Sequence, residues 1–336
     1  MINRKIGRWL IILFSIIVLL VCISFVSLWV GSVGIHLHEI FDILSKGEGT
    51  AEYSILFQIR LPRIILGFAV GGALSLAGAI LQGMFRNPLV EPYTLGISGG
   101  ASLGVCLNII FKWHAVIGVI AFPLSGFVGS ASVILFVYTL SLKKGILKTQ
   151  GMLLMGVMIS FISSSLVMLL MAISRSEDLH GIILWIMGSL EEPNMLLIKI
   201  AFWGSLLGLL LSYFYCLDLN ALALGDEEAI HLGVNVEKTK RMLFLIASIL
   251  TGFSVSVAGI IGFVGLIVPH FIRMFTGADH RILFISSFLA GACFLIFCDT
   301  LARTVIAPME LPVGVITGII GGVVFIYALS KKQVML

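Results

Sequence analysis

The sequence is poor in charge and in the residues that build covalent or metal frameworks. Only 11% of its 336 residues are Asp, Glu, Lys or Arg, whereas 59% are hydrophobic. The five cysteines are scattered without a CxxC pair, so they are interpreted as small buried hydrophobic residues and not as a disulfide or zinc framework. A net charge of +4 is too small and too dispersed to indicate nucleic-acid binding. A soluble core cannot use so much apolar surface, so the composition predicts an all-α polytopic membrane protein.

The sequence also lacks an ATP-binding motif and has few acidic residues within its apolar segments. The chain lacks GxxxxGK[ST], so active transport would need a separate ATPase. The apolar runs hold no acidic residue except Asp299, which argues against a proton or cation relay, and Arg303 stands four residues later to pair with it. We expect no cofactor and no metal site. His36 and His38 lack a third ligand and fit an interfacial amphipathic segment better.

Long apolar runs are what the sequence has instead. The first, at 9–30, is long enough to span a bilayer and is followed by no A-x-A-like cleavage site, so we interpret it as a retained helix. Run 242–272 carries Gly259, Gly262 and Gly265 halfway along, and we divide it there into two helices. Run 113–142 is interpreted as one tilted helix with a kink at Pro123. The remaining runs are 64–85, 92–111, 149–174, 200–217, 282–298 and 311–330.

Charge placement favours ten transmembrane helices with both termini in the cytoplasm. This arrangement puts fourteen of the 21 Lys and Arg residues inside, whereas an undivided run 242–272 would leave ten there. Segments AGAILQGMFRNP (77–88) and AGIIGFVGLIVP (258–269) run in opposite directions and share Ala-Gly and a later Pro, a weak sign of an inverted five-helix repeat. Glycines at every fourth residue predict close helix packing in two places, at Gly96, Gly100 and Gly104 and at Gly314, Gly318 and Gly322.

The stretch LGDEEAIHLGVNVEKTKR (224–241) is unusually charged, and the ten-helix arrangement places it in the cytoplasm. Three consecutive acidic residues from Asp226 suit the first turn of a short helix, where the helix dipole favours anions. Gly233 is placed to end that helix and Asn235 to cap the next one. The apolar residues Ala229, Ile230 and Leu232 would be displayed on one face. An ordinary solvated connector is the alternative, but a loop of this length usually has a function.

Five ordered blocks resemble the FecCD-type permeases, the membrane subunits of binding-protein-dependent ABC importers for iron–siderophores, haem and cobalamin. They are RLPRIILGFAVGGALSLAGAILQGMFRNPLVEPYTLGISGGASLG (60–104), LWIMGSL (184–190), LALGDEEAIHLGVNV (222–236), GFVGLIVPHFIRMFTGADHR (262–281) and DTLARTVIAPMELPVGVITGIIGGVVF (299–325). The resemblance covers nearly the whole chain, as one permease domain (1–336), and departs from the family where Gly322-Val323 replaces Gly-x-Pro. It implies ten helices in a bacterial cytoplasmic membrane, a second permease subunit, cytoplasmic ATP-binding subunits and an extracytoplasmic substrate-binding protein.

The resemblance also assigns roles to particular residues. Within the cytoplasmic loop 218–241 it implies that the ATPase contacts Leu224, Gly225, Asp226, Glu227, Ala229, Leu232 and Gly233. It implies docking of the binding protein at Arg60, Arg63 and Arg303. The residues alone allow other fates for these arginines, namely snorkelling to lipid phosphates or, for Arg303, pairing with Asp299.

The resemblance places a further set of residues near the inner gate or the pathway. At the inner gate it places Asn87, Leu89, Thr149 and Gln150. Met155, Met158 and Ser160 share the fifth helix with Ser163 and Ser164, and they suit either a neutral pathway lining or close packing of small residues.

The leading hypothesis is therefore a permease subunit without catalytic chemistry, with iron(III)–siderophore as the cargo and haem or cobalamin as alternatives within the family. A secondary transporter is the alternative from another class, but the charged cytoplasmic loop and the missing ionisable relay do not suit it. GISG (96–99) fits the GxSG pattern of rhomboid-type proteases, yet such a string is common in a glycine-rich helix and no AHxxG-like partner follows.

Overall fold

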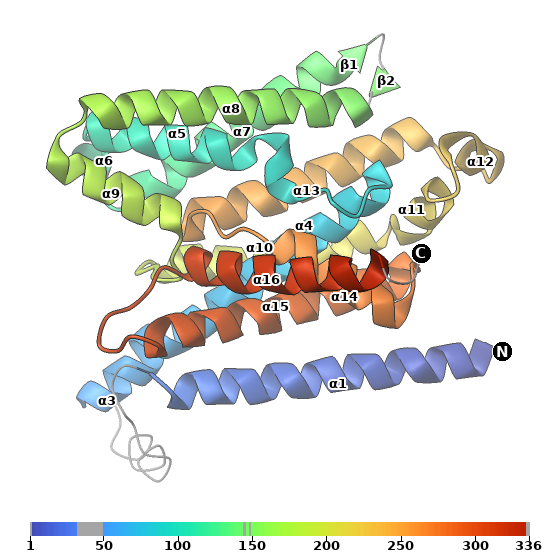
Figure 1. Cartoon of the computed structure of the whole chain (residues 1–336), viewed down its shortest axis with the longest axis horizontal. Coiled ribbons are helices and arrows are strands. Elements are labelled where there is room, and N and C mark those ends of the chain that lie inside the picture. The colour runs from blue at the N-terminus through green and yellow to red at the C-terminus, as the bar shows by residue number, and fades with distance from the viewer. Residues whose placement is uncertain (1, 32–49, 144–145, 148, 334–336) are drawn as a thin grey trace.

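Helix α4 (Leu61–Phe85) forms the centre of the fold and is buried along nearly its whole length. Four helices pack around it, namely α10 (Met195–Tyr213), α13 (Val236–Ala258), α14 (Val264–Thr276) and α15 (His280–Thr304). Helix α1 (Ile2–Trp29) lies along α15 at one edge of the bundle (Figure 1) and leaves most of its apolar surface exposed. This computed structural model describes residues 2–31, 50–143, 146–147 and 149–333.

The second layer is formed by α5 (Ile97–Ile110), α7 (Ala121–Ser141) and α8 (Thr149–Ile173), which pack on one another (Figure 1). Helix α16 (Val313–Gln333) packs on α15. Shorter elements connect these helices: α3 (Ala51–Ser54), the π-helix η1 (Ile55–Arg60), the 3₁₀-helix η2 (Pro92–Leu95), α6 (Trp113–Ile117), α9 (Ser176–Met187), α11 (Cys216–Leu222) and α12 (Asp226–His231). A small antiparallel hairpin joins β1 (Leu142–Lys143) to β2 (Ile146–Leu147).

The predicted helical class is confirmed for the described residues. Seven of their helices are long and apolar enough to cross a membrane, and three shorter apolar helices accompany them at Ile97–Ile110, Val264–Thr276 and Val313–Ala328. The starts of α1 and α13, the end of α16 and the whole of α12 lie at one end of the bundle, whereas α3, α6 and α9 lie at the other (Figure 1).

The two long apolar runs behave differently from each other. The predicted division of run 242–272 is confirmed, because α13 ends at Ala258, Gly259 has φ +68°, and α14 begins at Val264. The prediction of one kinked helix over 113–142 is wrong. Gly118 ends α6 with φ +82° and α7 starts at Ala121. Pro123 therefore lies in the first turn of α7, where its missing N–H breaks no helical hydrogen bond.

Glycines bring helix backbones together as predicted for the first of the two glycine rows. A Cβ on Gly100 would lie 2.5 Å from the carbonyl oxygen of Gly129 on α7, and one on Gly104 would lie 2.3 Å from that of Ser125. The second row differs, because a Cβ on Gly318 would meet no atom within 4 Å. Close packing is confirmed at Gly314, where a Cβ would lie 2.3 Å from the Met187 carbonyl oxygen, and it is wrong at Gly318 within the single subunit.

Candidate functional site

Helices α11 and α12 form a short hairpin at the end of the molecule where α1 begins (Figure 1). Gly225, with φ +139°, starts α12, and the three acidic residues occupy its first turn as predicted. Gly233, with φ +85°, follows the helix, and the Asn235 side chain accepts the Lys238 N–H at 3.1 Å. The predicted short helix, its glycine stop and the Asn235 cap are all confirmed.

The hairpin displays apolar side chains to its surroundings. Leu224, Ile230 and Leu232 are 68%, 60% and 64% exposed, and Glu227 is exposed beside them. Ala229 differs from the expectation, because it is fully buried in the core of the chain. Its small side chain lets α12 lie flat on the bundle, so it holds the helix in place and is not displayed.

Asp226 ties α12 to two membrane helices. Its carboxylate lies 2.5 Å from the Lys240 Nζ on α13 and 3.4 Å from the Arg86 guanidinium at the end of α4. A second link joins α11 to α13, where the Thr239 hydroxyl donates to Asp218 at 2.9 Å. These contacts connect the hairpin directly to the end of α4 and to the first turns of α13. Apart from the charges themselves, no sequence signal predicted these pairings.

Arg60 lies inside a helix and not at a helix start. The helical segment runs without interruption from Ala51 to Phe85, and Thr50 caps it by accepting the Tyr53 N–H at 3.2 Å. The Arg60 guanidinium donates to the carbonyl oxygens of Leu28 and Trp29 at the end of α1, at 2.6 and 2.9 Å. The end of α1 therefore supplies hydrogen-bond acceptors to this arginine within the chain.

Arg63 is likewise paired within the chain, although its buried Nε has no hydrogen-bond partner among the described residues. Its guanidinium forms ion pairs with Glu191, in the segment between α9 and α10, and with Glu310, in the segment between α15 and α16, the latter at 2.6 Å. The arginine is 5% exposed, whereas the Glu191 and Glu310 side chains are 63% and 35% exposed. The surface above Arg63 thus carries two carboxylates, which cover the buried positive charge.

Arg303 pairs with Asp299 one helical turn earlier on α15, at 3.0 Å, which confirms the alternative raised from their spacing. Its guanidinium also donates to the Ser27 hydroxyl of α1 at 2.8 Å. Arg60 and Arg303 therefore join α1 to the helices that carry them, and Arg63 joins α4 to the segments that hold Glu191 and Glu310.

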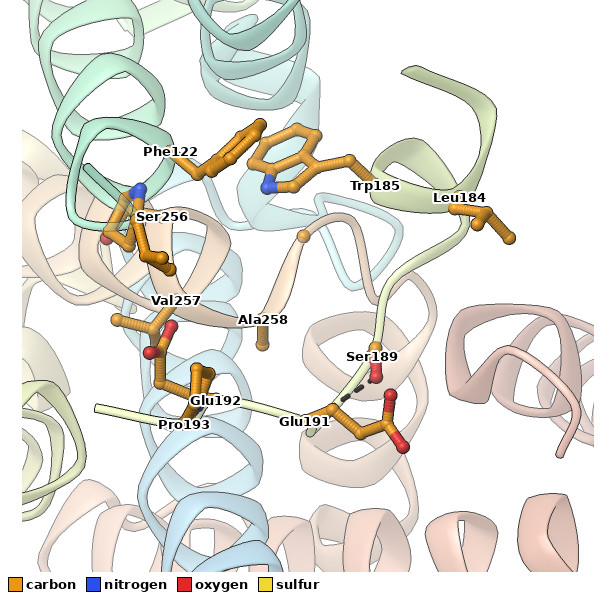
Figure 2. Close-up of a pocket in the computed structure, with 13 residues that line it drawn as sticks. Phe122, Leu184, Trp185, Ser189, Glu191, Glu192, Pro193, Ser256, Val257 and Ala258 are labelled. Atoms are coloured by element: carbon orange, nitrogen blue, oxygen red, sulfur yellow. Dashed lines mark hydrogen bonds between the residues drawn. The ribbon is translucent and has the colours of Figure 1, made fainter. Parts of the chain in front are cut away.

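A cavity of about 170 Å³ lies at the same end, between α7, α9 and α13. Figure 2 shows the Trp185 indole beside Phe122 on one side of it and Glu191 and Glu192 on the other. Burial raises the pKa of the Glu192 carboxyl above its ordinary value, although a hydrogen bond from the Asn194 N–H opposes the shift. The arrangement offers aromatic surface and carboxylates with raised proton affinity.

The residues assigned to the inner gate and pathway are spread over two places. Asn87 and Leu89 are exposed on the turn after α4, and the Asn87 side chain accepts the Leu89 N–H at 2.9 Å, so Asn87 shapes that turn. Thr149 is half-buried at the start of α8, where Gln150 follows it; the side chain of Gln150 lies outside the description.

The two interpretations of α8, a pathway lining and close packing of small residues, apply to different residues. Met155 and Met158 are 36% and 46% exposed, and Ser160 is half-buried. Ser163 is buried, and a Cβ on Gly99 of α5 would lie 2.9 Å from the Ser163 Cβ, which is the close packing of small residues. His36 and His38 lie outside the described residues.

The sequence analysis did not predict a set of hydrogen bonds that joins α4 and the segment after it to the break between α13 and α14. The Glu91 carboxylate accepts the Phe263 N–H at 2.7 Å, and the Tyr93 hydroxyl accepts the Ile261 N–H at 3.2 Å. These bonds satisfy backbone groups that the break between α13 and α14 leaves without helical partners. The Gln82 amide adds bonds to the start of α14, 3.0 Å from the Leu266 carbonyl oxygen. The only sequence signal was the acidic residue before Pro92.

Comparisons with known proteins agree on one family. The sequence profile of the FecCD transport family matches residues 16–331. The hemin transport system permease protein HmuU of Yersinia pestis is 39% identical over 320 residues, which cover 95% of each chain. The Fe(3+) dicitrate transport system permease protein FecD of Escherichia coli is 39% identical over 285 residues, or 85% of this chain and 88% of that one. The cobalamin import system permease protein BtuC of Halobacterium salinarum is 39% identical over 83% of this chain and 74% of that one.

A solved structure has the same fold over almost its full length. It is described as an inward-facing conformation of an ABC transporter assigned to the metal-chelate type. It superimposes with a TM-score of 0.84 at 32% identity, and the match covers 95% of this chain and 99% of that one.

Proposed function

Because the chain belongs to the FecCD transport family, and is thus an ABC importer permease, we propose that it translocates iron(III)–siderophore across the bacterial cytoplasmic membrane. In this proposal it carries out no reaction, and a cytoplasmic ATP-binding subunit drives the movement. Membership of this family favours a translocation subunit over a secondary transporter or a rhomboid-type protease. The observation that carries the proposal is the exposed apolar surface of α12, tied by Asp226 to α4 and α13.

We propose ten spans, with the N- and C-termini and α12 in the cytoplasm. The seven long and three shorter apolar helices of the described residues supply that number. The start of α1, the end of α16 and the whole of α12 lie at the same end of the bundle in Figure 1, which supports one cytoplasmic face. A cysteine placed at exposed Glu227 should therefore react with an impermeant thiol reagent only in inside-out vesicles. The matched control is Glu52→Cys, at exposed Glu52 of α3 on the opposite end, which should react in intact cells. Labelling of position 227 from outside would overturn this arrangement.

The cargo assignment to a ferric siderophore is supported by relatives named for ferric dicitrate and ferric hydroxamate transport. In cells that carry the full transporter, uptake of a radiolabelled ferric siderophore should be suppressed by the same unlabelled complex and not by hemin or cobalamin. A second candidate cargo is haem, which the 39% identity to the hemin permease over 95% of the chain favours. Suppression by hemin, with none by ferric siderophores, would establish that alternative.

We propose that the binding protein docks on the outer face above Arg60, Arg63 and Arg303. Because Glu191 and Glu310 neutralise Arg63, an acidic group of the partner has to compete with them. Removing both carboxylates, by Glu191→Gln with Glu310→Gln, should therefore tighten capture of the binding protein, by about tenfold for one charge pair gained. Surface plasmon resonance on the reconstituted transporter measures this affinity.

The control for this docking experiment is Glu192→Gln. That carboxylate lies next in the chain but accepts the Asn194 N–H, so its removal changes the charge of the face without releasing Arg63. If the double variant bound the partner no more tightly than Glu192→Gln does, the arginines would serve only to join α1, α4 and α15.

We propose that a second permease subunit, identical or homologous, completes the pathway. Asn87, Leu89, Thr149 and Gln150 would then lie near the inner gate, and Met155, Met158 and Ser160 would face the cargo. The exposed methionines of α8 support this role, because flexible thioether side chains suit a bulky neutral pathway lining.

A further inference from the structure

An open cavity of about 520 Å³ lies at the inner end of the bundle, where α4 and α14 end and α15 begins. Its charged lining residues are Arg86, at the end of α4, and Arg273, on the last turn of α14. No Asp or Glu is among the described residues that line it. The cavity is therefore a basic hollow formed by helices that are far apart in the sequence.

The nearby carboxylates are already engaged with other cations. Asp226 approaches Arg86 at 3.4 Å, but it lies closer, at 2.5 Å, to the Lys240 Nζ. Asp279 precedes the lining residue His280 and is held by Lys5 at 3.0 Å and by Arg281 at 2.7 Å. The two positive charges of the hollow are therefore only partly balanced by the protein.

The positive charge of Arg273 is offset by nearby carboxylates less than that of Arg86. It is half-buried, and within the described part of the chain it forms no ion pair with a carboxylate. Removing a guanidinium from water without an anionic partner is costly, so such a group in a hollow favours binding of an anion.

Two side chains of the lining also hold buried polar atoms. Gln82 and His280 are 2% and 3% exposed, and the Gln82 Oε1 and His280 Nε2 have no hydrogen-bond partner among the described residues. The Gln82 amide nitrogen donates to the Leu266 carbonyl oxygen, and the His280 Nδ1 lies 2.7 Å from the Asn220 side-chain oxygen. That contact puts the ring proton on Nδ1, which leaves Nε2 as an acceptor. Both atoms are buried, so the polar character offered to a ligand comes from Arg86 and Arg273.

We propose that this hollow binds a glycerol phosphate group, with the phosphate oxygens held by Arg86 and Arg273. Guanidinium groups match phosphate oxygens in pairs, and basic pockets between membrane helices bind anionic lipid headgroups. Met274, which lines the hollow and is 59% exposed, offers apolar surface for an attached acyl chain. The same chemistry occurs on phosphatidylglycerol and on free glycerol 3-phosphate.

The test measures ligand retention by native mass spectrometry on the full chain in an uncharged detergent. Phosphatidylglycerol should be retained and phosphatidylcholine should not. The Arg273→Gln variant should bind phosphatidylglycerol about tenfold more weakly, as expected for one charged hydrogen-bond partner. The control Lys238→Gln removes an exposed positive charge on α13 outside the hollow and should bind normally.

A second variant covers the case in which Arg273→Gln does not fold. Ala223→Phe fills the hollow from an exposed position on its wall without a change of charge, and it should weaken binding as well. Competition by free glycerol 3-phosphate would identify a soluble ligand, and its failure to compete would identify the lipid. Equal retention of phosphatidylglycerol by wild type, Arg273→Gln and Ala223→Phe would overturn the proposal. Because binding is measured without transport, this result is independent of the cargo and of the ATPase.

Discussion

Replacing Ile230 and Leu232 together by Asp should stop ferric siderophore uptake and release the ATPase subunit from the membrane. Both side chains are exposed on the hairpin, at 60% and 64%, so the change removes an apolar docking surface without opening the core of the chain. Burying each such side chain against a partner contributes about 1.5–3 kcal/mol, and 1.4 kcal/mol corresponds to a tenfold change in affinity. We therefore expect the ATPase affinity to fall at least about a hundredfold, as measured by co-purification and by vesicle uptake.

The control places one aspartate on an exposed aliphatic residue at the opposite end. Val116 of α6 is 89% exposed, and Val116→Asp should leave the ATPase bound. If the double Asp variant, present in the membrane at the normal level, kept both the ATPase and uptake, then energy would enter the permease elsewhere than at α12.

The hairpin could be predicted from sequence because its signals are local. Acidic residues in a first turn, a glycine stop and an Asn cap each act within a few residues, and α12 and the start of α13 follow them. The division of run 242–272 was visible for the same reason, since Gly259 adopts a positive φ. The burial of Ala229 was not visible. A helix of only six residues has no clear apolar stripe, so only its position on the bundle decides which side faces inward.

The partners of Arg60 and Arg63 could not be predicted from the residues next to them in the sequence. Arg60 and Arg63 interrupt an apolar run and therefore resemble the beginning of a membrane helix, yet the helix starts at Ala51. Their partners, the carbonyl oxygens at the end of α1 for Arg60 and the carboxylate of Glu310 for Arg63, come from distant parts of the chain. Partners at such separations leave no periodic pattern, so sequence could place the charges at one end but could not pair them.

Gly78→Ala should destabilise the permease more than any exposed substitution, because Gly78 lies at the crossing of α4 and α14. An added Cβ would lie 1.8 Å from the Gly265 carbonyl oxygen and 2.7 Å from its Cα. Both neighbours are backbone atoms, so no side-chain rotation relieves the clash and the two helices must separate. Separation would also stretch the bonds from Gln82 to the carbonyl oxygens of Gly265 and Leu266. Overpacking of this kind costs about 1–3 kcal/mol or more.

The buried cysteines of the chain provide the measurement. Cys106, Cys216, Cys293 and Cys298 are buried, so a thiol-reactive fluorophore reports on heating when the fold opens. Gly78→Ala should lower the midpoint of this transition by several degrees. Gly204→Ala on α10, where an added Cβ meets no atom within 4 Å, should leave it unchanged or slightly raised, since Ala favours a helix over Gly by about 1 kcal/mol. Equal midpoints for the two variants would mean that α4 and α14 are not in contact at this crossing, and then a motion of α4 driven through Arg86 could not reach α14 there.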